Sequence, residues 1–389
     1  MLMQDRSAPE SISLLLKPAS GLCNLACDYC FYRRTKALYP GNETKMTRKI
    51  LETVIRKTLS VDALFNSFCW QGGEPLLMGI DFFRDVVAFQ KKHARPGQII
   101  ENSLQTNGLL LDAAWCEFLR KENFLVGVSL DGPPEIHNVY RKDYAGRGSF
   151  DGVMRGIGLM QQHEVSFNIL CMLTDQNIRS PLELYDFFLS KGFSFLQFIH
   201  CFETNPQTGE LMPFAVRAEE TGEFYIRLFD AWFEKNFYDV SIRFFEDLLL
   251  YLVDGVKDSC CYQHSCSSYL VVEHNADCYP CDFFVSGEWK IGNLLESRLL
   301  TLMNSARRTA FARLKSDRPK ECKDCSIASF CMGDCTRFRF RGDSGDQRVS
   351  EYCAANQMVY RHIEPHLPEI KKRVAAFRSG RREEHLKTG

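Results

Sequence analysis

Three cysteines near the N-terminus have the spacing of a ligand set for an iron–sulfur cluster. Cys23, Cys27 and Cys30 form a C-x3-C-x2-C frame, with the aromatic Tyr29 inside it. Three thiolates on one short loop can hold three irons of a cubic cluster, and the frame supplies no fourth cysteine. The remaining iron is then open to a small chelating molecule, which a catalytic cluster needs and an electron-transfer cluster avoids.

This frame resembles that of the radical S-adenosylmethionine (SAM) enzymes. The resemblance implies a [4Fe–4S] cluster on the three cysteines, SAM on the open iron, and Tyr29 in contact with the cofactor. A second segment, Gly72-Gly73-Glu74-Pro75, follows a predicted strand, where glycines let the backbone approach a ligand closely. Alone it could be an ordinary turn. Together with the cysteine frame it resembles the radical SAM segment whose backbone receives the SAM amino group, and it includes Glu74.

A polar cluster, Ser129–Gly132, ends the fourth predicted strand, and Arg141 follows it closely. A SAM carboxylate needs hydroxyl and guanidinium donors, and the family resemblance points to Ser129 and Arg141. A plain turn and a surface ion pair are the alternatives for these residues. On the last predicted strand, Leu196-Gln197-Phe198 is a candidate segment to flank the adenine, with Leu196 as the expected contact.

The second half of the chain holds eight cysteines in two further frames, C-x5-C-x14-C and C-x2-C-x5-C-x3-C-x17-C. They are Cys260, Cys266, Cys281, Cys322, Cys325, Cys331, Cys335 and Cys353. Eight thiols suffice for two four-cysteine sites. Zinc held by four cysteines uses similar spacing, so the spacing leaves both metals open. The upstream radical SAM frame favours iron–sulfur clusters.

This region resembles the SPASM domain, the auxiliary-cluster extension of peptide-modifying radical SAM enzymes. The resemblance implies one [4Fe–4S] cluster on Cys260, Cys266, Cys281 and Cys335, and another on Cys322, Cys325, Cys331 and Cys353. Full cysteine ligation leaves no open iron and favours electron transfer. The neighbouring Cys261 and Cys278 then have no ligand role.

The segment Cys278–Phe284 reads C-Y-P-C-D-F-F and places Asp282 directly after a cluster ligand. A carboxylate there could take a proton from a substrate while an electron leaves toward the cluster, and a surface aspartate at a hairpin end is the alternative. From Leu14 to Cys353 the chain resembles the anaerobic sulfatase-maturating enzymes. The shared segments are L-x-K-P-A-S, Q-G-G-E-P, S-L-Q-T-N-G, D-G-P-x-E-I-H-N, N-I-L-C and Y-P-C-D-F.

That resemblance implies oxidation of a cysteine or serine, in a sulfatase C/S-x-P-x-R motif, to Cα-formylglycine. The cluster at Cys23, Cys27 and Cys30 would cleave SAM, and the resulting 5′-deoxyadenosyl radical would remove a hydrogen from Cβ of the target. Asp282 would deprotonate the thiol or hydroxyl, and the electron would leave through the auxiliary clusters. The implied partners are an unfolded or nascent sulfatase polypeptide and a flavodoxin- or ferredoxin-type electron donor.

Two other functions compete with this one. Another SPASM-type peptide modifier, such as a thioether-forming peptide maturase, would share the clusters but often carries an additional peptide-recognition domain. No such domain is evident before Leu14, which favours sulfatase maturation. A non-catalytic zinc-binding scaffold would be colourless, whereas three [4Fe–4S] clusters would bring about twelve irons per chain.

These residues require a scaffold of alternating strands and helices. Thr47 is expected to cap a helix that buries Ile50, Leu51, Val54 and Ile55. Alternation over about 200 residues predicts a parallel sheet, and six strand–helix units suit the partial (β/α)6 barrel of the radical SAM family. We expect strands at Ser13–Lys17, Ser67–Gln71, Ile99–Gln105, Leu125–Leu130, Ser166–Leu173 and Phe195–His200.

Two domains are expected. Residues 1–240 would form the radical SAM partial TIM-barrel domain, ending after a long amphipathic helix at Ala218–Phe237. Residues 241–389, where cysteines become dense, would form the SPASM auxiliary-cluster domain with a C-terminal helix.

Composition narrows the location and the partners. Of 389 residues, 45% are hydrophobic and 25% charged, which is typical of a soluble globular protein. The net charge of −1 does not favour nucleic acid or an anionic membrane as a partner. No apolar run approaches the ~18 residues of a spanning helix, and Met1 to Glu10 lack a signal-peptide pattern. Seventeen cysteines in a reducing cytoplasm are expected to be metal ligands or catalytic groups rather than disulfides.

Overall fold

The structure is a computed structural model that describes residues 9–33, 38–39, 44–205, 207–339 and 348–387. Most of Met1 to Glu10, whose sequence lacks a signal-peptide pattern, therefore lies outside the described residues. Two compact units make up the chain. Unit 1 comprises Met1–Leu130, Pro134–Ile169 and Ser265–Leu314, and unit 2 comprises Asp131–Pro133, Leu170–His264 and Lys315–Gly389. None of the described helices combines the length and the apolar character needed to span a bilayer.

Unit 1 is built on strands that run in the order β10-β9-β8-β1-β2-β3-β4. Strands β1 to β4 pair in parallel, and β8 also pairs in parallel with the free side of β1. Strand β9 is antiparallel to both β8 and β10. The bounds are Ser11–Lys17 (β1), Phe65–Trp70 (β2), Ile99–Thr106 (β3), Leu125–Ser129 (β4), Leu270–Glu273 (β8), Asp277–Tyr279 (β9) and Gly292–Asn293 (β10).

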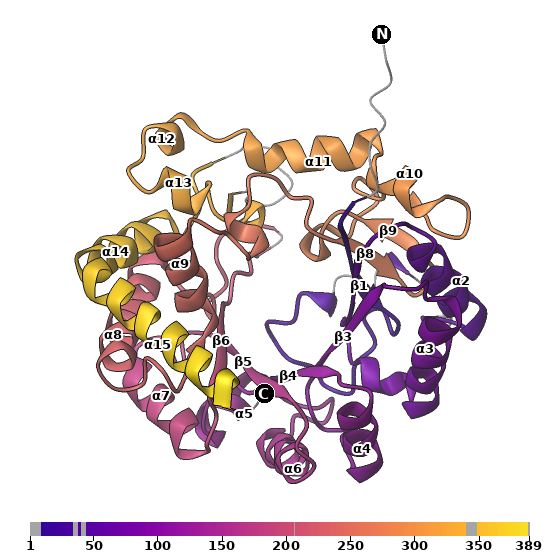
Figure 1. Ribbon diagram of the computed structural model, residues 1–389, viewed down its shortest axis with the longest axis horizontal. Helices are drawn as coiled ribbons and strands as arrows, with labels where there is room; N and C mark the ends of the chain where they lie inside the picture. Colours follow the sequence, from indigo (N-terminus) through magenta and orange to yellow (C-terminus); the bar gives the residue numbers. More distant parts are fainter. Residues whose placement is uncertain (1–8, 34–37, 40–43, 206, 340–347, 388–389) are drawn as a thin grey trace. The chain divides into compact units, whose positions relative to one another are not determined.

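Helices of unit 1 follow the strands as predicted, and Figure 1 shows α2, α3 and α4 along one side of them. Thr47 caps α2 by accepting a hydrogen bond from the Ile50 N–H at 3.3 Å. Leu51, Val54 and Ile55 are buried there, whereas Ile50 is partly exposed. The bounds are Arg48–Leu59 (α2), Ile80–His93 (α3), Ala113–Lys121 (α4), Pro134–Tyr140 (α5), Phe150–Gln162 (α6), Leu299–Met303 (α10) and Ala306–Ser316 (α11), which ends in unit 2.

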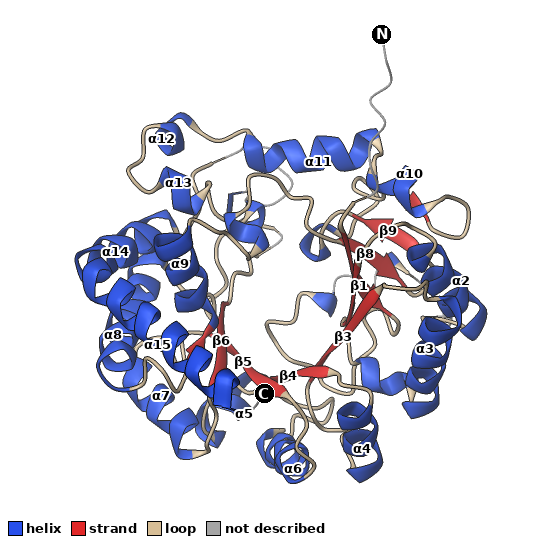
Figure 2. Ribbon diagram, in the orientation of Figure 1, coloured by secondary structure: helices blue, strands red, loops and turns tan. Residues whose placement is uncertain are grey.

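Unit 2 is mainly helical, as Figure 2 shows. Its α8 and α14 pack closely at Gly222, where a Cβ would lie 2.9 Å from the Met358 sulfur. Its strands are β5 (Phe167–Leu173, which begins in unit 1), β6 (Phe195–His200) and β7 (Ser241–Ile242). Its helices are α7 (Pro181–Ser190), α8 (Ala218–Lys235), α9 (Arg243–Asp254), α12 (Lys320–Lys323), α13 (Ala328–Cys331), α14 (Cys353–Ile363) and α15 (Leu367–Lys387).

All six predicted strands are present, within two residues of their expected ends. The sequence did not predict β8, β9 and β10, because each has four residues or fewer and lies in a cysteine-rich stretch without a long alternating pattern. Their presence has a consequence for the site. Strand β8 places the segment before Asp282 directly beside β1, which leads into the first cysteine frame.

Candidate active site

The loop with the first three cysteines follows β1 and is held by main-chain hydrogen bonds. The Ala26 N–H donates to the Lys142 carbonyl at 2.7 Å, and the Asp28 N–H donates to the Tyr140 carbonyl at 3.2 Å. A turn closes within the frame, where the Cys30 N–H donates to the Cys27 carbonyl at 3.2 Å. The three thiols are therefore presented by one short, anchored loop.

The surroundings of Cys23 suit a thiolate ligand. Its Sγ accepts hydrogen bonds from the Leu25 N–H at 3.4 Å and from the Asn107 side-chain amide at 3.6 Å. Burial raises the pKa of the Cys23 thiol to about 11, the negative charges of Glu74 and Cys30 raise it further, and the two donors oppose the rise. Coordination to iron would supply the missing positive charge, and the N–H donors would then tune the reduction potential of the cluster. In the described parts of the chain, no three Cys, His, Asp or Glu side chains are grouped around a single-ion position.

The backbone of the G-G-E-P segment passes so close to Lys17 and Leu22 that neither of its two glycines has room for a side chain. A Cβ on Gly73 would lie 1.9 Å from the Leu22 carbonyl oxygen, and one on Gly72 would lie 2.8 Å from the Lys17 side chain. Both glycines have positive φ, 88° at Gly72 and 51° at Gly73. The following Glu74 N–H donates to the Leu22 carbonyl at 2.7 Å. The segment is thereby packed directly against the start of the cysteine loop.

We expect Gly73→Ala to lower stability by more than about 1 kcal/mol and to abolish SAM binding, because the loop must shift to remove the clash. Gly79→Ala is a matched control: Gly79 also has positive φ, at 79°, but nothing lies within 4 Å of an added Cβ. Thermal unfolding and equilibrium dialysis with labelled SAM would measure both effects. Equal results for the two variants would contradict the close-approach argument.

The Glu74 side chain is used by the protein itself. It is fully buried, and its carboxylate accepts hydrogen bonds from the Leu76 N–H at 3.0 Å, the Thr106 hydroxyl at 2.9 Å and the Asn107 N–H at 2.8 Å. Burial raises its pKa to about 7, although these three donors oppose the rise. Glu74 therefore braces the glycine segment against the end of β3, and its main chain remains the part suited to a ligand.

The other residues predicted to bind SAM lie in unit 1, with one exception in unit 2. Arg141 is 8% exposed, which does not fit the surface ion pair considered above, and its guanidinium lies 5.5 Å from the centre of the Tyr29 ring. The Ser129 hydroxyl, at the end of β4, accepts a hydrogen bond from the Gln105 amide at 3.2 Å. Unit 1 thus contains all of them except Leu196, which is buried on β6 in unit 2.

Asp282 is a buried carboxylate rather than a surface residue. It is 5% exposed, and its Oδ2 accepts a short hydrogen bond from the Tyr32 hydroxyl. The Tyr32 oxygen in turn accepts from the Gln71 amide at 2.6 Å. Asp282 Oδ1 lies 3.6 Å from Lys17 Nζ and, within the described residues, accepts no hydrogen bond. One buried carboxylate oxygen is therefore open to accept a proton.

Lys17 is shared between two buried carboxylates. Strands β1 and β8 pair Lys17 with Glu273, and Lys17 Nζ lies 2.8 Å from Glu273 Oε1, with both side chains fully buried. Burial raises the pKa of Asp282; Lys17 and the Tyr32 hydrogen bond oppose the rise, and Glu273 adds to it. Because Lys17 lies near both carboxylates, its positive charge offsets the cost of burying Asp282 as well as Glu273.

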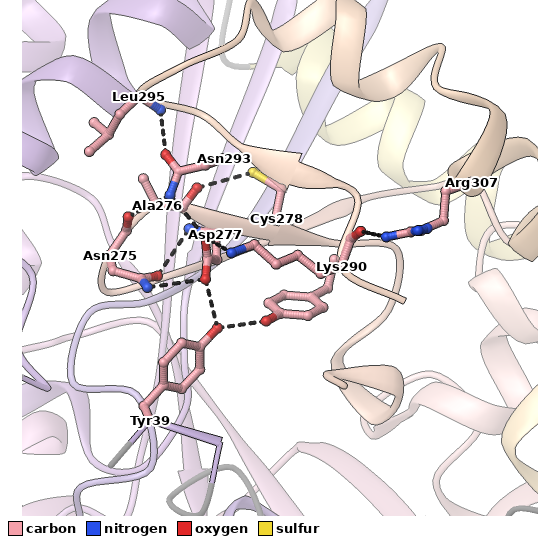
Figure 3. Close-up of polar contacts among 10 residues, drawn as sticks. Tyr39, Asn275, Ala276, Asp277, Cys278, Lys290, Asn293, Leu295 and Arg307 are labelled. Carbon is pink, nitrogen blue, oxygen red and sulfur yellow. Dashed lines mark hydrogen bonds and ion pairs between the residues drawn. The ribbon is translucent and has the colours of Figure 1, made fainter. Parts of the chain in front are cut away.

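The hairpin that precedes Asp282 is fixed by a separate polar cluster (Figure 3). The buried Asp277 carboxylate pairs with Lys290 at 2.7 Å and accepts from the Asn293 amide at 2.9 Å. The Tyr39 hydroxyl donates to Asp277 at 3.4 Å. Cys278 is fully buried on β9 of this hairpin, and burial raises its pKa to about 12.

The eight cysteines predicted to hold auxiliary clusters are distributed over both units. Cys266 and Cys281 belong to unit 1, and the Tyr269 hydroxyl lies 3.4 Å from the Cys281 sulfur. The other six belong to unit 2. There, burial is the main cause of the raised pKa of Cys322, and negative charge on Cys353 and Cys325 adds to it. Burial and the negative charge of Asp334 raise the pKa of Cys331, and Cys353 adds a smaller contribution. This mutual influence fits four thiolates around one cluster.

Sequence reasoning missed the side chains that surround Asp282. Lys17, Tyr32, Gln71 and Glu273 come from four separate segments, which β-strand pairing brings together. Lys17 and Gln71 lie in the quoted segments L-x-K-P-A-S and Q-G-G-E-P, so those segments were a usable signal for them.

Comparisons with known proteins agree on the domains. The model of the radical SAM superfamily matches residues 18–188. The model of the iron–sulfur cluster-binding domain called SPASM matches residues 260–326.

Curated relatives and a solved structure match most of the chain. A cysteine-type anaerobic sulfatase-maturating enzyme of Clostridium perfringens is 36% identical over 93% of this chain and 99% of its own length. A serine-type enzyme of Bacteroides thetaiotaomicron is 34% identical over 92% and 91%. The solved structure of native anSMEcpe with bound AdoMet and Cp18Cys peptide has a TM-score of 0.88 at 36% identity and covers 94% of this chain and 99% of that one.

Proposed function

The chain belongs to the anaerobic sulfatase-maturating enzymes, a family of radical SAM enzymes with a SPASM domain, and we propose that it converts a cysteine or serine in a sulfatase C/S-x-P-x-R motif to Cα-formylglycine. It uses SAM and [4Fe–4S] clusters, auxiliary clusters included. The observation that carries the proposal is the match of most of the chain to relatives named for this activity, together with a buried carboxylate next to a proposed cluster ligand.

We assign the first cluster to Cys23, Cys27 and Cys30. The anchored loop and the N–H donors to Cys23 support this assignment. For SAM we propose the main chain of the glycine segment, with donors and packing from the residues around it. These residues are Tyr29, Gly72, Gly73, Glu74, Ser129, Arg141 and Leu196.

The auxiliary ligands are proposed as two sets of four. One set is Cys260, Cys266, Cys281 and Cys335, and the other is Cys322, Cys325, Cys331 and Cys353. The electrostatic influence among the thiols of the second set supports that grouping.

Asp282 acts as the general base in this proposal. When bound, the clusters and SAM would supply the 5′-deoxyadenosyl radical that takes a hydrogen atom from Cβ of the target, and a route for the electron that must then leave. A serine target would then give the aldehyde directly. A cysteine target would give a thioaldehyde, which water would hydrolyse to the aldehyde with release of sulfide. The open Oδ1 of Asp282 takes the proton of the target thiol or hydroxyl. Tyr32 and Lys17 hold the carboxylate in place during this transfer. Burial makes Asp282 a stronger base than an exposed aspartate.

The peptide substrate is a sulfatase polypeptide, and we propose that it is bound unfolded or nascent. A flavodoxin- or ferredoxin-type protein is the proposed electron donor. The proposed location is the cytoplasm. All seventeen cysteines lie within the described residues and have free thiols, which suits a reducing compartment. We also propose residues 1–240 as the radical SAM domain and residues 241–389 as the SPASM domain with a C-terminal helix.

Neither competing function gains an observation in its favour. Both curated relatives are named for sulfatase maturation rather than thioether formation. A zinc scaffold would not need the first cysteine frame or a buried carboxylate next to Cys281.

Anaerobic incubation with a C-x-P-x-R peptide, SAM and a reductant tests the proposal. We expect formylglycine in the product peptide by mass spectrometry, together with methionine and 5′-deoxyadenosine. A parallel S-x-P-x-R peptide measures the preference for cysteine or serine. A peptide with alanine at the target position is the control and should yield no aldehyde. Absence of formylglycine from both reactive peptides, with about twelve irons bound per chain, would contradict the proposal.

A further inference from the structure

The C-terminal cysteine region contains a turn that is left-handed at three consecutive residues. Met332, Gly333 and Asp334 have φ values of 51°, 80° and 62°, and they link Cys331 to Cys335. For residues with a Cβ, this conformation costs roughly 1 kcal/mol or more each. Two of the three carry a Cβ, so contacts with the surrounding protein must hold the turn.

The side chain of Asp334 makes most of those contacts. It is 7% exposed, and its Oδ1 accepts from the Cys335 N–H at 2.6 Å. Its Oδ2 accepts from the Ser350 hydroxyl at 2.6 Å and the Asn356 amide at 3.1 Å. The Asp334 N–H donates to the Cys331 carbonyl at 2.8 Å. One carboxylate therefore ties the turn to the chain around the start of α14.

The charge of Asp334 is balanced only indirectly. Among the described residues no cationic side chain forms an ion pair with this carboxylate. The fully buried Lys315 Nζ instead donates to the main-chain oxygens of Asp334, at 2.6 Å, and Cys261, at 2.7 Å. The charge lies close to two thiols: burial is the main cause of the raised pKa of Cys331 and of Cys261, and the negative charge of Asp334 adds to both.

Cys331 and Cys335 are proposed ligands of different auxiliary clusters, so this turn is shared by both. We propose that Asp334 is a positioning residue for the two auxiliary clusters, fixing their shared turn and lowering their reduction potentials. A buried negative charge opposes the arrival of an electron, and net charge and hydrogen bonding set cluster potentials. This inference rests on the ligand assignment proposed above.

The test is a redox titration followed by EPR. The parent carries Cys23→Ala, Cys27→Ala and Cys30→Ala, which leaves the auxiliary clusters alone, with about eight irons per chain. In this parent, Asp334→Asn should move at least one auxiliary potential to a more positive value, because asparagine removes the charge and tolerates positive φ. Asp254→Asn is the matched control: it removes a carboxylate of unit 2 that pairs with Arg378, and it should cause no shift.

A second variant keeps the test decisive if Asp334→Asn loses iron. Ser350→Ala keeps the carboxylate but removes one donor, so its charge is less shielded and the potential should become more negative. Shifts of the reduction potential in opposite directions in the two variants support the proposal. If Asp334→Asn loses iron, a more negative potential in Ser350→Ala supports it alone. Unchanged potentials in Ser350→Ala, with both clusters present, would overturn it. Failure of the ligand assignment is distinguishable, because the parent itself would then lack the two clusters.

Discussion

The Cys27→Ala variant is expected to form no 5′-deoxyadenosine above background when incubated anaerobically with SAM and dithionite. A cubic cluster with SAM on one iron needs all three thiolates of the first frame, and alanine removes one. Cys27 is 8% exposed on an anchored loop, so a neighbouring cysteine cannot easily take its place. The bound iron should fall from about twelve to about eight per chain, and chromatography of the nucleoside product measures the loss of activity.

Cys278→Ala is the matched control for this experiment. Cys278 is also a buried cysteine of unit 1, but it lies in the hairpin before Asp282 and has no assigned ligand role. We expect it to retain the full iron content and SAM cleavage. Native rates of cleavage in Cys27→Ala would show that the frame does not hold the catalytic cluster.

The second large effect is expected for Asp282→Asn, which should lower formylglycine yield by about 10²- to 10⁴-fold, the usual contribution of a general base. Asparagine keeps the shape and can still contact Tyr32, but it cannot take the proton of the target. Because SAM cleavage needs only the first cluster, 5′-deoxyadenosine should still form. Mass spectrometry of the peptide and chromatography of the nucleoside separate the two outcomes.

The pH dependence gives an independent check on this base. Burial raises the pKa of Asp282 above its ordinary value of ~3.9. The base works when deprotonated, so wild-type turnover should fall as pH decreases through this raised pKa, and Asp282→Asn should lack that limb. Asp85→Asn, which removes a partly exposed carboxylate paired with Arg48, is the control and should behave as the wild type. Full maturation activity in Asp282→Asn would remove the base assignment.

Features that depend on local sequence were predictable. The six strands are short segments enriched in apolar or β-branched residues, and Thr47 has the residue type and position of an N-cap. The cysteine frames and Asp282 follow from spacing and adjacency, which the chain carries without reference to its fold.

Features that depend on strand register were not predictable. The contact of Lys17 with Glu273 requires that β8 pair with β1 in one particular register, across more than half of the chain. No local pattern specifies that pairing. Glu74 illustrates the same difficulty at a single residue, since the glycine segment predicted a ligand contact but not that the carboxylate would brace Thr106 and Asn107.

The fully buried Lys17 also links the stability of this interior to its proposed chemistry. Loss of Lys17 would leave two buried carboxylates, Glu273 and Asp282, without the cation they share, at a cost of about 3–5 kcal/mol. A substitution of Lys17 is therefore expected to be tolerated only when the carboxylates are replaced as well, and that replacement would remove the proposed base.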